Sequence, residues 1–135
     1  PVSVRDELTV SGHDGADFFN GSFERGLIRV EEAGIDFQPG ISLHKGESDV
    51  ISLFAAGRGD YIIIDDGRGS AFCRDNSMPY INALLAVKIL NICGKTGKDE
   101  TVEMYNRLKV CGRYSATVIE WADGAGENDL KFFML

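Results

Sequence analysis

The strongest indication of the fold is the apolar run 61–64 (YIII), which is followed directly by the aspartates Asp65 and Asp66. A short run that is apolar at every position is typical of a strand covered on both faces in the middle of a parallel sheet. In open parallel sheets, functional residues lie beyond the carboxyl ends of the strands. The sequence therefore predicts that this strand carries two adjacent carboxylates to a sheet edge where a site can form.

Helices are predicted on both sides of this strand. In the segment 45–57, Val50, Ile51 and Phe54 share one face, and Gly57 is a suitable residue to end a helix. Strands that alternate with helices indicate an α/β fold with a mainly parallel sheet. The other predicted elements are helices at 2–10, 16–25, 68–75, 82–93, 99–111 and 116–122, strands at 27–31 and 79–81, and loops at 12–15 and 33–46.

The composition fits one globular domain that spans residues 1–135, with 122–135 as a C-terminal tail. Hydrophobic residues make up 44% of the chain and charged residues 26%, which is ordinary for a soluble protein. The net charge of −7 argues against coating nucleic acid by bulk electrostatics. It leaves room for an enzyme that gathers carboxylates around a cation, and the cation then faces phosphate.

The location expected from the sequence is the cytoplasm. No apolar run approaches the ~20 residues of a membrane span, and the opening residues PVSVRDEL do not resemble a signal peptide. Cys73, Cys93 and Cys111 are odd in number, far apart in sequence and set in apolar helical patterns. We expect reduced, buried thiols, because no zinc-ligand spacing is present.

Glu47 is a candidate partner of the aspartate pair. It lies in the first turn of the 45–57 helix, on the face of Ile51. A helix that precedes a parallel strand runs antiparallel to it, so this turn is expected near the edge where Asp65 lies. Carboxylates brought together repel unless a cation lies between them, which predicts a Mg²⁺ or Mn²⁺ site. A purely structural role also suits these residues, with Glu47 at a helix N-terminus and the aspartates beginning a turn.

One more acid and two arginines could each belong to a functional site or simply be solvated surface residues. Glu7 borders the apolar face that Val4 and Leu8 form in the first predicted helix, and by itself it reads as a solvated acid. Arg68 and Arg74 follow the aspartate pair, where they could approach an RNA backbone or simply be solvated arginines.

Six segments follow one another in a familiar order: PVSVRDEL, GLIRV, KGESDVISLFA, YIIIDDGRGSAF, MPYINALLAVKIL and LKVCGRYSATVIEWA. This order resembles the PIN-domain family, in particular its VapC-like branch of prokaryotic toxin-type nucleases. The resemblance covers residues 1 to about 122. It is most specific where GESDVI, IIIDDGRG and the helix that contains LLAVK occur at this separation.

The resemblance implies a three-layer α/β/α fold and a metal-dependent endoribonuclease that hydrolyses RNA phosphodiesters. PIN nucleases group acids around Mg²⁺ or Mn²⁺, and the matching positions here are Glu7, Glu47 and Asp65. Asp66 would be a neighbour or substitute in the catalytic group. Asn82 could hold a ligand water, and with Arg68 it makes up the expected substrate-binding set. The partners implied are an RNA substrate, an antitoxin protein and a second copy of the chain in a homodimer, with no membrane.

The chain departs from the PIN pattern at two points. The family normally begins with a strand that carries an aspartate in a D-x-S/N-x-L context, and these 135 residues hold no such strand. The usual Gly-Thr pair is replaced by Asn82-Ala83. The alternatives are a catalytically inactive PIN-like interaction domain and a small-molecule-binding α/β regulatory domain. The apolar end DLKFFML (129–135) could supply a strand or a partner-binding tail.

Overall fold

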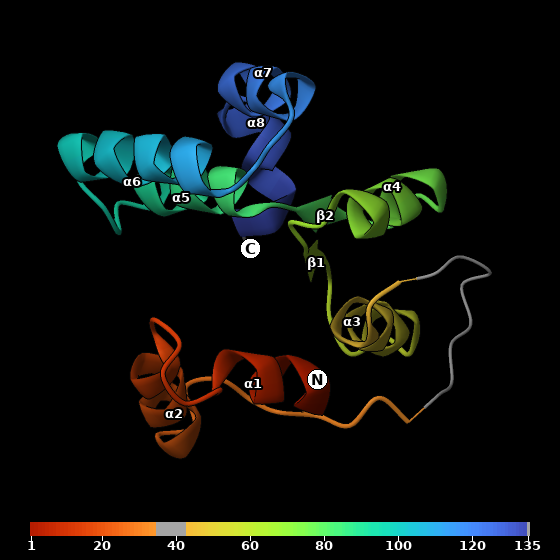
Figure 1. The fold of residues 1–135 in the computed structure, drawn as a ribbon. Coiled ribbons are helices and arrows are strands. Elements are labelled where there is room, and N and C mark those ends of the chain that lie inside the picture. Colours follow the sequence, from red (N-terminus) through yellow and green to blue (C-terminus); the bar gives the residue numbers. More distant parts are fainter. Residues whose placement is uncertain (35–42, 135) are drawn as a thin grey trace. The chain divides into compact units, whose positions relative to one another are not determined.

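The structure is a computed structural model that describes residues 1–34 and 43–134. The chain divides into two compact units, Pro1–Ile62 and Ile63–Leu135 (Figure 1). Most of the loop expected at 33–46, including the QPG sequence at 38–40, lies outside the described residues.

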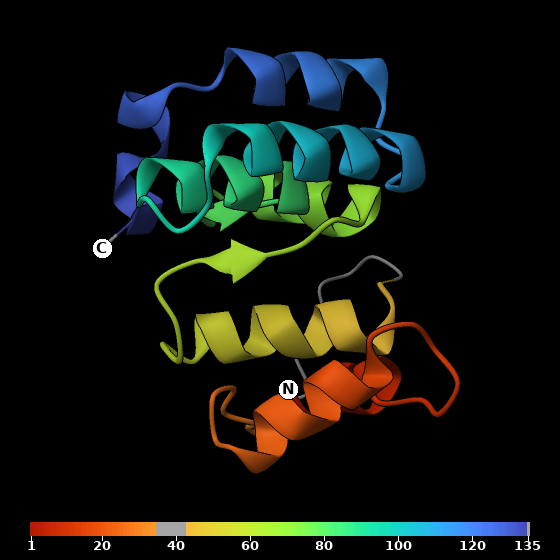
Figure 2. The same cartoon turned by 90° about the vertical axis from the view of Figure 1, so that its left-hand side faces the viewer.

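The first unit contains the helices α1 (Val2–Leu8), α2 (Ala16–Glu24) and α3 (Lys45–Ala55). Helix α1 packs against both α2 and α3 (Figure 2). All three helices were predicted, and α3 ends as expected: Gly57 has a φ of 71° and donates its N–H to the carbonyl of Phe54. These elements form where local chemistry favours them, because helix boundaries depend on neighbours within a turn.

The prediction of a strand at 27–31 is wrong. This segment has no regular secondary structure, although its residues alternate in polarity. The carbonyl of Glu31 accepts a hydrogen bond from Val2 N at 3.1 Å, and its carboxylate pairs with Arg29 at 2.8 Å and Arg58 at 2.7 Å. The hydrogen bond from Arg58 is the largest cause that holds the pKa of Glu31 below its usual value. Alternation alone does not make a strand when no described strand pairs with the segment.

The second unit holds a two-stranded parallel sheet and most of the helices. Strands β1 (Ile62–Ile63) and β2 (Tyr80–Ile81) flank the helix α4 (Gly67–Asp75), and Ile64 N donates to Ile81 O at 2.9 Å. The boundary between the units falls within β1. The helices that follow are α5 (Ala83–Ile92), α6 (Lys98–Cys111), α7 (Ala116–Gly124) and α8 (Glu127–Leu130), with a 3-10 helix, η1, at Lys131–Met134.

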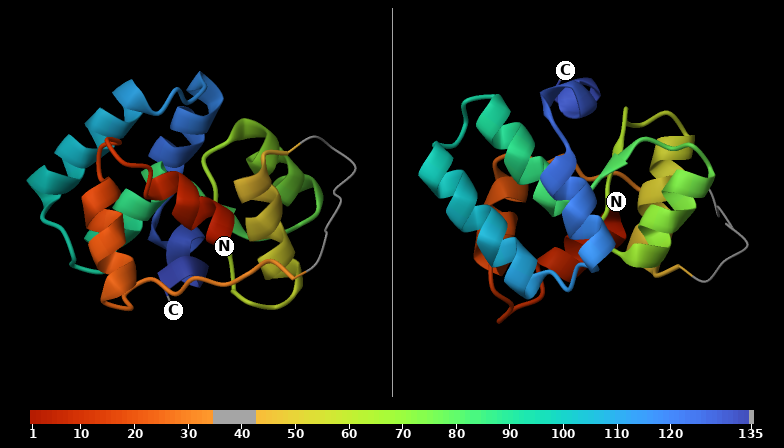
Figure 3. Two further views of the ribbon diagram at one scale, coloured as in Figure 1. Left: turned by 60° about the horizontal axis from the view of Figure 1, so that its bottom comes forward. Right: turned by 90° about the horizontal axis from the view of Figure 1, so that it is seen from above.

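Helix α5 is the centre of this unit. It packs along α6 and also contacts α7 and α8 (Figure 3). Leu84, Leu85 and Val87 on α5 are buried, and Leu130 of α8 is 1% exposed. Burial of such side chains is worth about 1.5–3 kcal/mol each, so this apolar helix supplies much of the core.

The fold is α/β and mostly helical, and its sheet is smaller than predicted. Ile62 and Ile64 are buried but Ile63 is 61% exposed, so the expectation that residues 61–64 are covered on both faces is wrong. In the described part of the chain, β1 pairs only with β2. Successive side chains of a strand point to opposite faces, so Ile63 lies on an uncovered face while Ile62 and Ile64 lie on the covered one.

Two expectations about the C-terminal half are also corrected. Residues 127–134 are helical, so the tail is not a strand. Cys73 is buried, which raises the pKa of its thiol, but Cys93 and Cys111 are exposed because they lie at the ends of α5 and α6. Among the described residues, no helix combines the length and apolar character needed to cross a membrane.

Candidate functional site

Among the residues predicted from the sequence, Asp65 has a carboxylate that is held through one oxygen only. It follows the carboxyl end of β1 and is exposed. Its Oδ1 accepts two hydrogen bonds, from Ala83 N at 3.0 Å and from Tyr114 Oη at 2.7 Å. Among the described residues, none forms a hydrogen bond or an ion pair with the other oxygen of Asp65, Oδ2. The carboxylate is therefore fixed through one oxygen and offers the second to a ligand.

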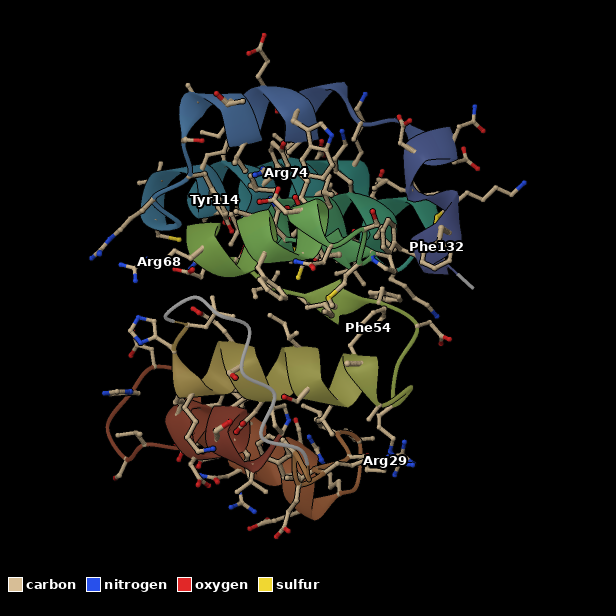
Figure 4. All side chains as sticks on the ribbon, turned by 90° about the vertical axis from the view of Figure 1, so that its right-hand side faces the viewer. Arg29, Phe54, Arg68, Arg74, Tyr114 and Phe132 are labelled. Atoms are coloured by element: carbon tan, nitrogen blue, oxygen red, sulfur yellow. The ribbon has the colours of Figure 1, made fainter. Side chains whose placement is uncertain are left out.

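The turn between α6 and α7 carries Tyr114, which is labelled in Figure 4, and the Tyr114 hydroxyl donates to Asp65 Oδ1. A Cβ at Gly112 would lie 2.2 Å from Tyr114 Cε2 and 2.7 Å from the carbonyl oxygen of Leu108, so the ring occupies space that only glycine leaves free. Arg113 has a φ of 52°, which is uncommon for a residue other than glycine. Burial, and then the hydrogen bond to Asp65, raise the pKa of the Tyr114 phenol, which keeps it a hydrogen-bond donor.

Asp66 and Asn82 both cap helices. Asp66 Oδ1 accepts from Arg68 N at 2.7 Å and Gly69 N at 3.1 Å at the start of α4. Asn82 is 5% exposed, and its Oδ1 accepts from Leu85 N at 3.0 Å at the start of α5. Each side-chain oxygen thus satisfies helix N–H groups that would otherwise lack partners. The adjacent aspartates therefore differ in role, with Asp66 structural and Asp65 available.

In the first unit, Glu7 of α1 lies beside the N-terminus of α3, and Glu47 lies in the first turn of α3. A Cβ at the buried Gly46 would be 3.2 Å from Glu7 Oε1 and 3.3 Å from Oε2, so this carboxylate lies close to the first turn of the helix. Glu47 Oε2 accepts from His44 N at 3.0 Å, which closes the same turn. The positive end of the helix dipole stabilises both acids there. This is the structural role that the sequence left open for Glu47.

Arg68 and Arg74 project from opposite ends of α4 and are exposed (Figure 4). Arg74 forms an ion pair with Asp75 at 3.3 Å. Surface pairs of this kind contribute about 0–1 kcal/mol, so Arg74 can exchange Asp75 for another anion at little cost.

A cleft of about 240 Å³ lies beside Asp65, within the second unit. Its lining joins the end of β1, the start of α4 and the α6–α7 turn, together with Trp121 of α7. Sequence reasoning had included Asp65 and Asn82 from this lining, but it missed Arg113, Tyr114 and Trp121. The glycine-basic-aromatic-serine order GRYS was the available signal, yet a turn's sequence does not show which distant carboxylate its tyrosine reaches.

Within neither unit do three His, Cys, Asp or Glu side chains of the described residues form a group that could hold a metal ion. Asp65 is the described carboxylate of the second unit that borders the cleft. A comparison with known proteins gives no match to a family model, to a curated protein or to a solved structure.

Proposed function

We propose that the chain is a PIN-like, metal-dependent endoribonuclease with Asp65 as a carboxylate ligand of Mg²⁺ or Mn²⁺. The main support for this proposal is the hydrogen bonding of the Asp65 carboxylate. Oδ1 is held by Ala83 N and Tyr114 Oη, while Oδ2 has no partner among the described residues and the side chain borders a cleft. Hard cations prefer carboxylate oxygens of this kind, so Asp65 suits the ion that the PIN resemblance implies.

The bound metal would activate water for attack on a phosphodiester. In this proposal the chain's own residues orient the ligand: Tyr114 keeps Asp65 from rotating, and Asn82 and Asp66 hold the starts of α5 and α4. The PIN resemblance adds Glu7 and Glu47 of the first unit to the ligand set, and it supports a three-layer arrangement, a homodimer and an antitoxin partner. These additions rest on the order of the sequence motifs.

The first test is cleavage of single-stranded RNA with Mg²⁺ or Mn²⁺ and with EDTA, compared for wild type, Asp65→Asn, Glu7→Gln and Glu47→Gln. We expect cleavage that stops in EDTA and falls at least about a hundredfold in Asp65→Asn, because loss of a ligand should cost no less than the roughly 10–100-fold that loss of an outer-shell partner costs. Asp75→Asn is the matched control, because Asp75 is an exposed aspartate of the same unit that pairs with Arg74 and does not line the cleft. Cleavage that ignores both EDTA and Asp65→Asn would refute the mechanism.

Calorimetric titration with Mn²⁺ provides a measurement that does not depend on turnover. Wild type and Asp75→Asn should bind the ion, and Asp65→Asn should bind it more weakly by at least about tenfold, the smallest loss that is typical even for an outer-shell partner of a metal ligand.

The second candidate is a catalytically inactive PIN-like interaction domain, which the net charge of −7 favours because it repels an RNA backbone. Absence of Mn²⁺ binding by the wild-type chain at millimolar concentration would select this alternative.

A further inference from the structure

The cleft beside Asp65 has an aromatic wall. Trp121 is 51% exposed although it belongs to a helix that packs on the core, and Tyr80 and Tyr114 line the same cleft with Val118. A half-exposed indole facing a cleft offers a flat apolar surface to a planar ligand. The cleft volume of about 240 Å³ is just below the ~300–1,000 Å³ of sites for drug-sized molecules, so it suits one ring system with a small attached group.

Polar groups complete the lining. Arg113 forms no hydrogen bond or ion pair with any residue in the described ranges, and its backbone is held at a φ of 52°. Sparsely populated backbone conformations of this kind are enriched at ligand-binding positions. The hydroxyl groups of Ser70 and Ser115 lie in the same lining. An unpaired guanidinium in a chain of net charge −7 marks a local preference for an anion, and the nearby hydroxyls suit a sugar or a base edge.

We infer that this cleft binds one unstacked nucleotide of a single-stranded RNA, with its base against Trp121 and a backbone phosphate beside Arg113. Base stacking on an aromatic side chain, combined with a cation for the backbone, is how proteins hold single strands without reading a sequence. The inference rests on the proposed nuclease function for the identity of the ligand. Since Asp65 lines the same cleft, a nucleotide bound there brings its phosphodiester to the proposed metal ligand.

The chain provides its own probe, because Trp121 is its only tryptophan. Hexauridylate and hexaadenylate are titrated into the wild-type protein in EDTA, so that binding is measured without metal or cleavage. We expect saturable quenching of Trp121 fluorescence by both oligonucleotides, and none by ribose 5-phosphate or by an RNA duplex. Quenching by ribose 5-phosphate to the same extent would overturn the role of the base, and equal quenching by the duplex would overturn binding of an unstacked nucleotide.

Variants are followed by the anisotropy of a fluorescein-labelled hexauridylate. Trp121→Ala should weaken binding roughly 5- to 150-fold, the range measured for loss of one stacking contact. Phe132→Ala is the matched control, because Phe132 has the same exposed fraction of 51% and lies outside the cleft. Arg113→Gln should reduce the slope of log K against log salt by about 0.7, the value for one phosphate contact to a single strand.

The two proposals fail in different ways. RNA cleavage without any change in Trp121 fluorescence would overturn the nucleotide site and leave the nuclease proposal standing. Quenching and Trp121-dependent binding without metal-dependent cleavage would support the nucleotide site and refute the nuclease. Equal losses of affinity in Trp121→Ala and Phe132→Ala would also overturn the site.

Discussion

Replacement of Gly112 by alanine tests whether the α6–α7 turn is built around the Tyr114 ring. The new Cβ would lie 2.2 Å from Tyr114 Cε2, where ordinary contacts begin at 3.4 Å, so the ring would have to move by about 1.2 Å (3.4 − 2.2). The carbonyl oxygen of Leu108, 2.7 Å from the same Cβ, blocks relief on the helix side. The Tyr114 ring can make room for the added methyl group only by moving away from Asp65.

The expected loss of stability combines opposing contributions. Gly112 has φ −80° and ψ −2°, which alanine adopts readily. Alanine also restricts the unfolded chain and by itself would stabilise the fold by about 0.4–1 kcal/mol. Overpacking costs about 1–3 kcal/mol, and losing the Tyr114–Asp65 hydrogen bond costs about 0.5–1.5 kcal/mol. We therefore expect a net loss of about 2 kcal/mol in the free energy of unfolding.

Urea unfolding followed by Trp121 fluorescence measures this quantity in the second unit, where the only tryptophan lies. With a slope of about 2 kcal/mol per M, the midpoint should fall by about 1 M. Gly124→Ala is the control, since Gly124 ends α7 and a Cβ there meets nothing within 4 Å. It should leave stability unchanged or raise it.

A double-variant cycle separates the two close contacts. In a Tyr114→Ala background the clash with the ring is gone, so Gly112→Ala should cost less than it does in wild type. A Gly112→Ala protein as stable as wild type would refute the reasoning, because the turn would then have room that the structure does not show.

Two titratable groups and a buried thiol can be tested in solution. Asp65→Asn should lower the pKa of Tyr114, measured by absorbance at high pH, because the carboxylate that favours its neutral form is gone; an unchanged titration would contradict the Tyr114–Asp65 bond. Burial is the largest single effect on the pKa of Asp49 and raises it. The hydrogen bonds from the Ser3 hydroxyl at 2.6 Å and from Lys45 at 2.9 Å lower the pKa and together outweigh burial, so the pKa lies below its usual value. Wild type should be more stable than Asp49→Asn above pH 3.8, the ordinary pKa of an aspartate, and this difference should decline as the pH falls through the lower pKa that Asp49 has in the folded protein. A difference in stability that grows in acid would contradict the prediction. In thiol labelling with Ellman's reagent, Cys93 and Cys111 should react at once and Cys73 only on unfolding, so three equally fast thiols would contradict its burial.

Local elements were largely predictable from the sequence. Helices α3 and α5 were expected close to their observed bounds, Gly57 ends the turn after α3, and Ser115 Oγ accepts from Val118 N at 3.3 Å as the cap of α7. Apolar periodicity and caps decide these features within a few residues, so they can be read without knowing the rest of the fold.

The roles of the two aspartates were not predictable in the same way. Both stand after an apolar run, and the pair alone does not show which one is available. Asp66 binds N–H groups two and three residues further on, which is a local effect. Asp65 instead accepts hydrogen bonds from Ala83 and Tyr114, which lie 18 and 49 residues away in the chain.

The α/β class, the positions of most helices and the presence of a carboxylate at the end of a strand could all be read from the amino-acid order alone. Three features became known only from the folded chain: residues 27–31 pair with no described strand, Ile63 is exposed, and Gly112, Arg113 and Tyr114 line a cleft with Asp65. Helix formation depends on neighbours within one or two turns, whereas strand pairing, exposure and the geometry of a site depend on residues that folding brings together from distant parts of the chain.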